Sequence, residues 1–328
     1  MLGLDGLELR PVARADAAKL VELFATGFGS PVTPAYFEWK YERSPWGKAI
    51  AFVADAGDRL AGFYGLIPEP WSVAGEITLV HQAADAVTHP DFRRRGLSVE
   101  LAQHTYAAAR RNLEPLVLVA TPGPASRGAF VGPLGWTVAR ELEFIGVPSL
   151  RFRVGRAPRD LEAIEVADPH PDVERVLSSA PPTGPAAPSL AGNFFDWRVY
   201  GQSPTPFVVT LARRGGEPVG VVVSARTSTR TLLIAYVAGI REIPLSAWLP
   251  GTLRSIATNQ GGHVVYTWRP QRADLAEQYR SLGFRTNRLP LGPLRERRWL
   301  VVRSDEKYVR GVRWADASAF DLQPLMQS

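Results

Sequence analysis

Three arginines and a glycine stand between two segments of different character. The stretch "THPDFRRRGLS", residues 88–98, follows an apolar run (79–88) that predicts a buried strand and precedes a helix-forming segment (97–111). The first N–H groups of a helix have no partner within it, and a glycine lets an anion approach the backbone. Neighbouring arginines add charged hydrogen bonds. The pattern therefore predicts a phosphate or pyrophosphate site at the N–H groups of about residues 94–98.

The spacing of the residues in this segment narrows the class of ligand that it could bind. Neither the Walker pattern nor the dinucleotide fingerprint G-x-G-x-x-G is present. The order Arg93-x-x-Gly96-x-Ser98 behind "THPDF" instead resembles the acetyl-CoA pyrophosphate loop of the GCN5-related N-acetyltransferases (GNAT), V-x-P-x-x-[RQ]-x-x-G-x-[GA]. Thr88 and Ser98 are mild departures from that pattern. The segment "LELRPVARADAAKLVELF" (7–24) and "LGW" (134–136) also fit, so the resemblance covers residues 5–150.

The resemblance implies direct acyl transfer from an acyl-CoA, acetyl-CoA foremost, to a primary amine of a small molecule, without a metal. Some tandem members of the family act on amino sugars. In the family, the strand end before the loop holds the thioester carbonyl and the loop holds the pyrophosphate. Carried over to this sequence, the CoA-binding residues are Ala86, Val87, Thr88, Arg93, Arg94, Arg95, Gly96, Leu97 and Ser98. The usual tyrosine acid is replaced by Val131, while the second half has Tyr279 at its matching place.

The attacking amine needs a base, and strand alternation suggests two candidates. In a regular strand His81, Ala83, Asp85 and Val87 share one face, so Asp85 and then His81 are the preferred catalytic residues. Two other interpretations remain open: Asp85 only holds the strand in place, or His81 is a core histidine. Glu141 and Glu143 are further candidates.

The chain also repeats itself. "YFEWKYERSP" (36–45) is echoed by "FFDWRVYGQSP" (194–204), which pairs Trp39 with Trp197 and Lys40 with Arg198. Three more echoes, one upstream and two downstream, occur in the same order, and each copy predicts strand, two helices, hairpin, strand, helix, strand, short helix and final strand. We expect an α+β protein, a mixed sheet with helices on both faces, in two GNAT-like domains at residues 1–153 and 160–328. The Pro/Gly-rich stretch 178–192 is interpreted as a mobile surface loop.

The second copy lacks the anion-binding loop. Between its corresponding strand (231–239) and helix (246–258) lies "IREIPLS", which contains no glycine. Bulky Ile243 and Leu245 leave no room for a pyrophosphate. The sequence thus predicts that only the first half binds CoA and that the degenerate second half completes the acceptor pocket.

Composition limits the alternatives. Without cysteine there is no disulfide, thiolate metal site or cysteinyl acyl-enzyme, and a net charge of +6 favours anionic partners. Nucleic-acid binding is a weaker alternative, best represented by the basic stretch 293–314, and a CoA-binding sensor without catalysis is another. A tRNA-dependent aminoacyl transferase also uses doubled units of this fold, but the intact loop argues against it. The longest apolar run (231–240) is too short for a membrane, the start of the chain carries no export signal, and we expect a cytoplasmic monomer or homodimer.

Overall fold

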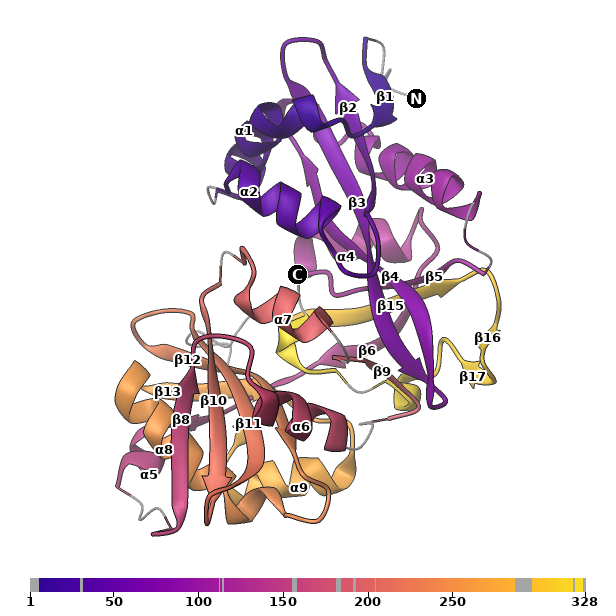
Figure 1. The fold of residues 1–328 in the computed structure, drawn as a ribbon. Coiled ribbons are helices and arrows are strands. Elements are labelled where there is room, and N and C mark those ends of the chain that lie inside the picture. Colours follow the sequence, from indigo (N-terminus) through magenta and orange to yellow (C-terminus); the bar gives the residue numbers. More distant parts are fainter. Residues whose placement is uncertain are drawn as a thin grey trace.

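The computed structural model describes residues 6–29, 32–111, 113, 115–154, 158–180, 184–190, 193–203, 205–286, 297–320 and 322–326. Two large mixed sheets with flanking helices make up most of the molecule (Figure 1). No helix within these residues is long and apolar enough to cross a membrane.

The first sheet is built mainly from the N-terminal half. Its strand order is β1 (Glu8–Pro11), β2 (Ile50–Asp55), β3 (Leu60–Val73), β4 (Glu76–Thr88), β5 (Val117–Ala120), β15 (Arg298–Ser304) and β6 (Thr137–Leu142). Its helices are α1 (Ala17–Phe28), α2 (Pro34–Phe37), α3 (Leu97–Arg110) and α4 (Pro124–Val131). Residues of α3 and α4 share one hydrophobic cluster and residues of α1 and α2 another, so the two pairs cover opposite faces.

The second sheet repeats this plan. Its strand order is β14 (Arg285–Thr286), β7 (Phe144–Pro148), β13 (Val264–Trp268), β12 (Thr231–Gly239), β11 (Glu217–Arg226), β10 (Phe207–Arg214) and β8 (Leu161–Val166). Its helices are α5 (Leu150–Arg153), α6 (Pro171–Ser179), α7 (Asn193–Tyr200), α8 (Leu249–Gln260) and α9 (Ala273–Ser281). The expected α+β class and the repeated order of elements are confirmed, with helices again on both faces.

The two halves exchange strands. β7, from the first half, pairs with β13 and β14 of the second sheet, while β15, from the second half, lies between β5 and β6 of the first. Sheet membership therefore crosses the expected boundary between residues 153 and 160, of which residues 155–157 lie outside the described part. The exchange also explains the basic stretch 293–314: from residue 297 on, much of it is β15, whose Leu300, Val301 and Val302 are buried.

Part of the Pro/Gly-rich stretch is not a surface loop. Residues Ala186–Pro188 form β9, which pairs with Trp71–Val73 of β3, and Ala186 and Ala187 are buried. β3 continues well past the end of its pairing with β2 at Leu66, so its edge there is open to another strand. The expectation of a mobile loop is wrong for these residues; residues 181–183 and 191–192 lie outside the described part.

The repeated aromatic motif joins the two halves. The indoles of Trp39 and Trp197 stack with centroids 5.0 Å apart, and each Nε1 donates to the backbone oxygen of the other residue at 2.9 and 3.0 Å. Gly201 allows this approach, because a Cβ there would lie 2.1 Å from Nε1 of Trp39. The two copies therefore meet in a reciprocal contact between these tryptophans.

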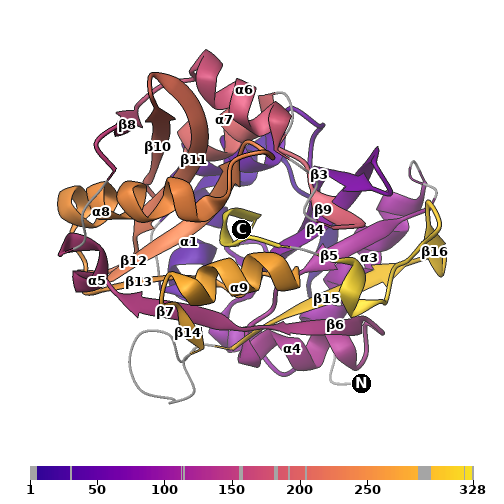
Figure 2. The same ribbon diagram turned by 90° about the horizontal axis from the view of Figure 1, so that it is seen from below.

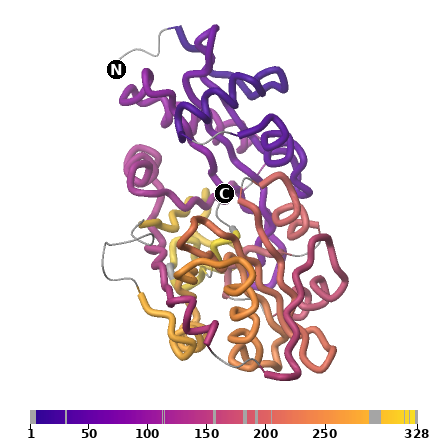
Figure 3. Tube along the Cα trace, turned by 90° about the vertical axis from the view of Figure 1, so that its left-hand side faces the viewer, coloured from indigo at the N-terminus to yellow at the C-terminus, as the bar shows by residue number. Residues whose placement is uncertain are grey.

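The last described residues lie between the two sheets (Figures 2 and 3). Phe320 and Leu322 pack with Trp71 and Trp268, one from each sheet, and Leu325 is fully buried in the second half. A small hairpin of β16 (Tyr308–Val309) and β17 (Val312–Arg313) precedes them.

Candidate functional site

The arginine-glycine turn stands at the start of α3. Gly96 is the N-cap residue with φ +78°, and Arg94 also has a positive φ of +63°. Within the described residues, the N–H groups of residues 94–98 have no hydrogen-bond acceptor. A side chain at Gly96 would meet nothing within 4 Å, so the space beside the turn is open. The turn therefore offers successive N–H donors to an external anion.

Two of the three arginines brace this turn. Arg93 donates to the backbone oxygens of Thr88 and Gly27 at 3.1 and 3.2 Å, which ties the end of β4 to α1. Arg95 donates to the backbone oxygen of Asp91 at 2.9 Å, and its guanidinium lies over the Phe92 ring. The guanidinium groups remain exposed, so they add positive charge beside the free N–H groups.

The strand before the turn diverges from its neighbour. β4 pairs with the parallel strand β5 only at His81 and Gln82, yet continues to Thr88. Its register with β3 also shifts, because three steps from Ala84 to Val87 face two steps from Gly65 to Phe63. This β-bulge gives Asp85 a φ of +55°. The segment 86–88 thus leaves the sheet on the β5 side next to the start of α3.

The bulge overturns one expectation. His81, Ala83, Asp85 and Val87 do not share a face: Ala83 packs with the α3 cluster, whereas Val87 packs with α1 and α2. Asp85 points to the same face as Val87. There its Oδ2 accepts hydrogen bonds from side chains of α2 and of the π-helical turn Glu38–Glu42 that follows α2. An inserted residue reverses the alternation that a regular strand would have.

Asp85 is closely surrounded by donors. Its Oδ2 accepts from Lys40 Nζ at 2.5 Å, Tyr41 Oη at 2.5 Å and Tyr36 Oη at 2.9 Å. Burial alone would raise the pKa of Asp85, but the charge of Lys40 and these hydrogen bonds hold it below the ordinary value. A carboxylate so stabilised is a weak base, which favours the interpretation that Asp85 holds the strand in place.

Residues that sequence reasoning missed extend this charged cluster across the interface between the halves. Glu69 on β3 is 5% exposed, and burial raises its pKa to about 7, partly offset by the charge of Arg198 on α7. Arg198 is itself buried and donates to the Leu325 oxygen at 3.0 Å. Two features of the sequence could have indicated these residues. Lys40 and Arg198 are matching positions of the repeat, and Glu69 is a lone acid in an apolar strand.

The remaining candidates lie apart from the cluster. His81 is 4% exposed, and burial lowers its pKa to about 4, which fits the core-histidine interpretation. Glu143 pairs with Arg269 and Glu141 with Arg297 at the surface. Val131 packs against the α3 cluster. No group of three or more potential metal-ligating side chains occurs in the part of the chain that the structure describes.

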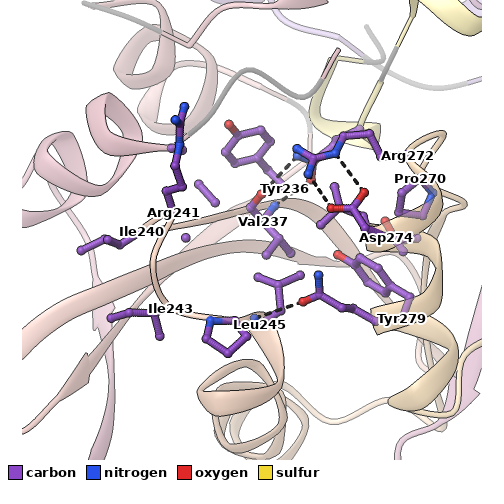
Figure 4. Close-up of a pocket in the computed structure, with 18 of the residues that line it drawn as sticks. Tyr236, Val237, Ile240, Arg241, Ile243, Leu245, Pro270, Arg272, Asp274 and Tyr279 are labelled. Carbon is purple, nitrogen blue, oxygen red and sulfur yellow. Dashed lines mark hydrogen bonds and ion pairs between the residues drawn. The ribbon is translucent and has the colours of Figure 1, made fainter.

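The second half holds a cleft at the corresponding place. β12 pairs with the parallel strand β13 only through Thr231–Leu233 and then diverges from it. A cavity of about 390 Å³ lies in this opening, between the end of β12, the loop 240–245 and α9 (Figure 4). Arg272 and Asp274 form an ion pair on its wall, and buried Tyr279 also contributes to the lining.

Glutamine side chains form hydrogen bonds with polar backbone groups of this cleft. Gln278 Oε1 accepts from the N–H of Leu245, at the start of the short helical turn that precedes α8. Gln323 pairs with both backbone groups of Val237, accepting from its N–H at 2.8 Å and donating to its oxygen at 3.1 Å. The cleft resembles that of the first half in outline, but its N–H groups at Leu245 and Val237 are already bonded to glutamine side chains.

Comparisons with known proteins find relatives of this fold. Residues 8–139 match the family described as acetyltransferase (GNAT) domain. A probable N-acyltransferase from Enterococcus faecalis V583 superposes with a TM-score of 0.64 at 14% identity, covering 90% of this chain and 72% of its own. No curated protein sequence matches the chain.

Two further solved structures cover nearly the whole chain. A tandem GNAT protein from the clavulanic acid biosynthesis pathway gives a TM-score of 0.62 at 17% identity, over 92% of this chain and 100% of its own. The N-myristoyltransferase of Saccharomyces cerevisiae with bound myristoyl-CoA gives 0.60 at 12% identity, over 92% and 83%. Residues 8–139 thus match the GNAT acetyltransferase domain, and the whole chain has the fold of a tandem GNAT protein.

Proposed function

We propose that the protein is an acyl-CoA-dependent N-acyltransferase whose first half binds the acyl donor. The observation that carries the proposal is the run of N–H groups at residues 94–98, which have no partner among the described residues, beside the diverging end of β4. A diphosphate held there would place the rest of the donor along the opening between β4 and β5. The Saccharomyces cerevisiae relative was solved with myristoyl-CoA, which supports an acyl-CoA ligand for this fold.

The donor site is assigned residue by residue. Residues 94–98 bind the pyrophosphate through their N–H groups, and Arg93, Arg94 and Arg95 supply positive charge. We propose that the backbone of Ala86, Val87 and Thr88 polarises the thioester carbonyl, because β4 has no pairing with β5 beyond Gln82. Acetyl is the proposed acyl group.

The reaction is a direct transfer. The amine nitrogen attacks the thioester carbon, a C–N bond forms, the C–S bond breaks and the thiolate leaves. The proton lost from nitrogen passes to a base or to water. Asp85 stays ionised because Lys40, Tyr36 and Tyr41 donate hydrogen bonds to it, so we propose that it holds the bulge in place. His81 and Glu69 are the remaining candidates for the base, and the pKa of Glu69, about 7, suits that task better.

The acceptor is proposed to be a small molecule with a primary amine, such as an amino sugar. The second half supplies part of its surroundings, because α7 and the last described residues pack directly against the first half. Direct transfer of this kind requires no metal.

The test combines CoA binding with turnover. Gly96→Glu puts a carboxylate where the diphosphate would lie, so CoA affinity should fall at least about 100-fold in calorimetric titration. Gly75→Glu is the matched control: Gly75 also has a positive φ (+86°) with nothing within 4 Å, but lies in the β3–β4 turn. Equal CoA affinity in both variants would refute the donor site. Thiol release from acetyl-CoA, followed across amino sugars, polyamines, aminoglycosides and peptides, then identifies the acceptor.

A CoA-binding sensor is the second candidate. Val131 at the usual position of the acid and the fully engaged Asp85 both favour it. A thiol leaves readily without an acid because its pKa is about 8.5, so we rank the enzyme first. CoA binding without thiol release for any amine would reverse that order.

A further inference from the structure

The start of β2 forms a notch at the edge of the first sheet. β1 pairs with β2 only as far as Pro11, opposite Phe52, whereas β2 itself starts at Ile50. The chain then enters a short 3₁₀ turn that leads to α1. In the described part of the chain, β1 therefore leaves Ile50 without a neighbouring strand on this side. Helices α1 and α2 lie on one side of β2 and α3 on the other (Figure 1).

A cavity of about 670 Å³, which we call the edge cavity, lies in this notch between β2, α1, the turn after α2 and the end of α3. Its volume is within the range of roughly 300–1,000 Å³ for small-molecule pockets. The aromatic residues of its lining are Phe37, Tyr41, Phe52 and Phe63. Phe52 and Ile50 are only partly buried, so apolar surface is in contact with water here. Covering that surface with an apolar ligand is favourable.

The aromatic wall of the edge cavity is preformed. The ring of Tyr41 stacks on Phe37 with centroids 5.9 Å apart and meets Phe63 edge-on at 5.1 Å. The hydroxyl of Tyr41 donates to Asp85 at 2.5 Å, which fixes the orientation of the ring. A wall that is already ordered loses little conformational freedom when a ligand binds to it.

Positive charge predominates at the rim. The charged residues of the lining are Arg14, Lys48, Arg111, Glu38 and Glu42. Arg43 adds a further cation, since it donates to Glu38 at 2.6 Å. Lys48 and Arg111 are exposed, and within the described residues neither has an acidic partner. Four cations thus surround two acids, which favours an anionic ligand.

The lining and the rim together define a class of ligand. Aromatic and aliphatic walls accept an apolar body, whereas cations at the exposed rim accept one negatively charged group that stays close to water. An alkyl or aryl carboxylate combines these two features. A neutral apolar molecule would make no use of the rim charges, and a polyphosphate would leave the apolar walls in water.

The edge cavity is distinct from the proposed donor site. Helix α3 begins after Gly96 in the donor turn, and its 14 residues span about 21 Å at 1.5 Å per residue before it reaches the cavity. In the same way, Arg93 contacts Gly27 at the end of α1, whereas Ala17 at the start of α1 lines the cavity. The two sites therefore lie at opposite ends of the same two helices.

We propose that the edge cavity is a second binding site, for a small molecule with an apolar body and a single carboxylate. The apolar body contacts the rings of Phe37, Tyr41 and Phe52, and Lys48 and Arg111 attract the carboxylate at the rim. The site stands independently of the acyl transfer proposed for the donor site.

The first test measures the charge preference by calorimetric titration of the full chain. Decanoate and 2-naphthoate are the probes, and decyltrimethylammonium, with a similar chain and the opposite charge, should not bind. Lys48→Glu combined with Arg111→Glu should weaken binding of both carboxylates at least about tenfold. Lys307→Glu combined with Arg230→Glu changes the net charge equally at exposed positions outside the cavity and should leave binding nearly unchanged.

The second test fills the edge cavity. Ala108 lines it from the end of α3, so Ala108→Trp should abolish binding of both carboxylates. Ala107→Trp is the matched control, because Ala107 is the preceding residue of the same helix but is exposed and outside the lining. Ala51→Trp fills the cavity from β2 and replaces Ala108→Trp should that variant fail to fold.

Each outcome decides for or against the site. Carboxylate binding that is lost on charge reversal and on filling supports it, and the stronger probe tells whether a chain or a ring is the better body. No carboxylate binding to the wild type, equal binding of decyltrimethylammonium, or binding that Ala108→Trp and Ala51→Trp leave intact overturns it. Titrations repeated in Gly96→Glu should give unchanged affinities, so failure of this site is distinguishable from failure of the donor site.

Discussion

Both halves contain an opening between two parallel strands, but the backbone N–H groups beside it are hydrogen-bonded differently in the two halves. In the first half, the turn before α3 leaves the N–H groups of residues 94–98 without partners among the described residues. In the second half, Gln278 and Gln323 satisfy the N–H groups of Leu245 and Val237. Copies of one fold can thus keep a cleft while only one of them leaves this run of N–H donors without partners among the described residues.

The difference follows from local chemistry. Gly96 adopts φ +78° and exposes the amides behind it, whereas "IREIPLS" has a proline and bulky side chains at that place. Polar backbone groups left in the opening of the second half need other partners. Glutamine side chains supply them, since a carboxamide both donates and accepts.

The largest expected effect concerns Lys40, whose matching cation in the repeat is Arg198. Lys40 is 2% exposed and neutralises the carboxylate of Asp85, whose side chain is 13% exposed. Lys40→Met should lower the free energy of unfolding by about 3–5 kcal/mol, because it leaves that charge unpaired. Adding Asp85→Asn should restore at least half of the loss in urea unfolding. A loss below about 1 kcal/mol for Lys40→Met would contradict the assigned cluster.

The next largest effect is the pH dependence of the free energy of unfolding. The pKa of Glu69 is raised from 4.5 to about 7 by burial, so its ionisation opposes folding. The stability it contributes is complete below about pH 4.5 and is lost as pH rises through 7, a change of about 3 kcal/mol. Glu69→Gln cannot ionise and should lack this decline when the unfolding free energies of both proteins are compared from pH 4.5 to 8. Parallel curves for the two proteins would show that Glu69 is not buried as described.

The smallest effect tests the reciprocal contact of the repeat. Trp39→Phe and Trp197→Phe each remove one indole hydrogen bond and part of the stacking. We expect similar losses and a coupling energy of about 1 kcal/mol in a double-mutant cycle of unfolding free energies. Strictly additive losses would mean that the two tryptophans do not stabilise one another.

Much of the fold was visible in the sequence because it is encoded by local patterns. The strand 231–239 and the helix from residue 97 were placed from hydrophobic runs, turn residues and helix-start signals, and they match β12 and α3. The repeat gave the order of elements in both halves. The candidate turn at Arg93–Ser98 was found for the same reason, since its arginines and glycine are adjacent in the chain.

The sequence alone determined the duplication, the strand-turn-helix unit with its glycine, and the absence of that glycine from the second copy. Tertiary structure decided the bulge that turns Asp85 toward Lys40, the exchange of β7 and β15, and the placement of Gln323 on Val237. Each of these joins residues at least 45 positions apart. Such contacts depend on how whole elements pack, which no local pattern of residues specifies.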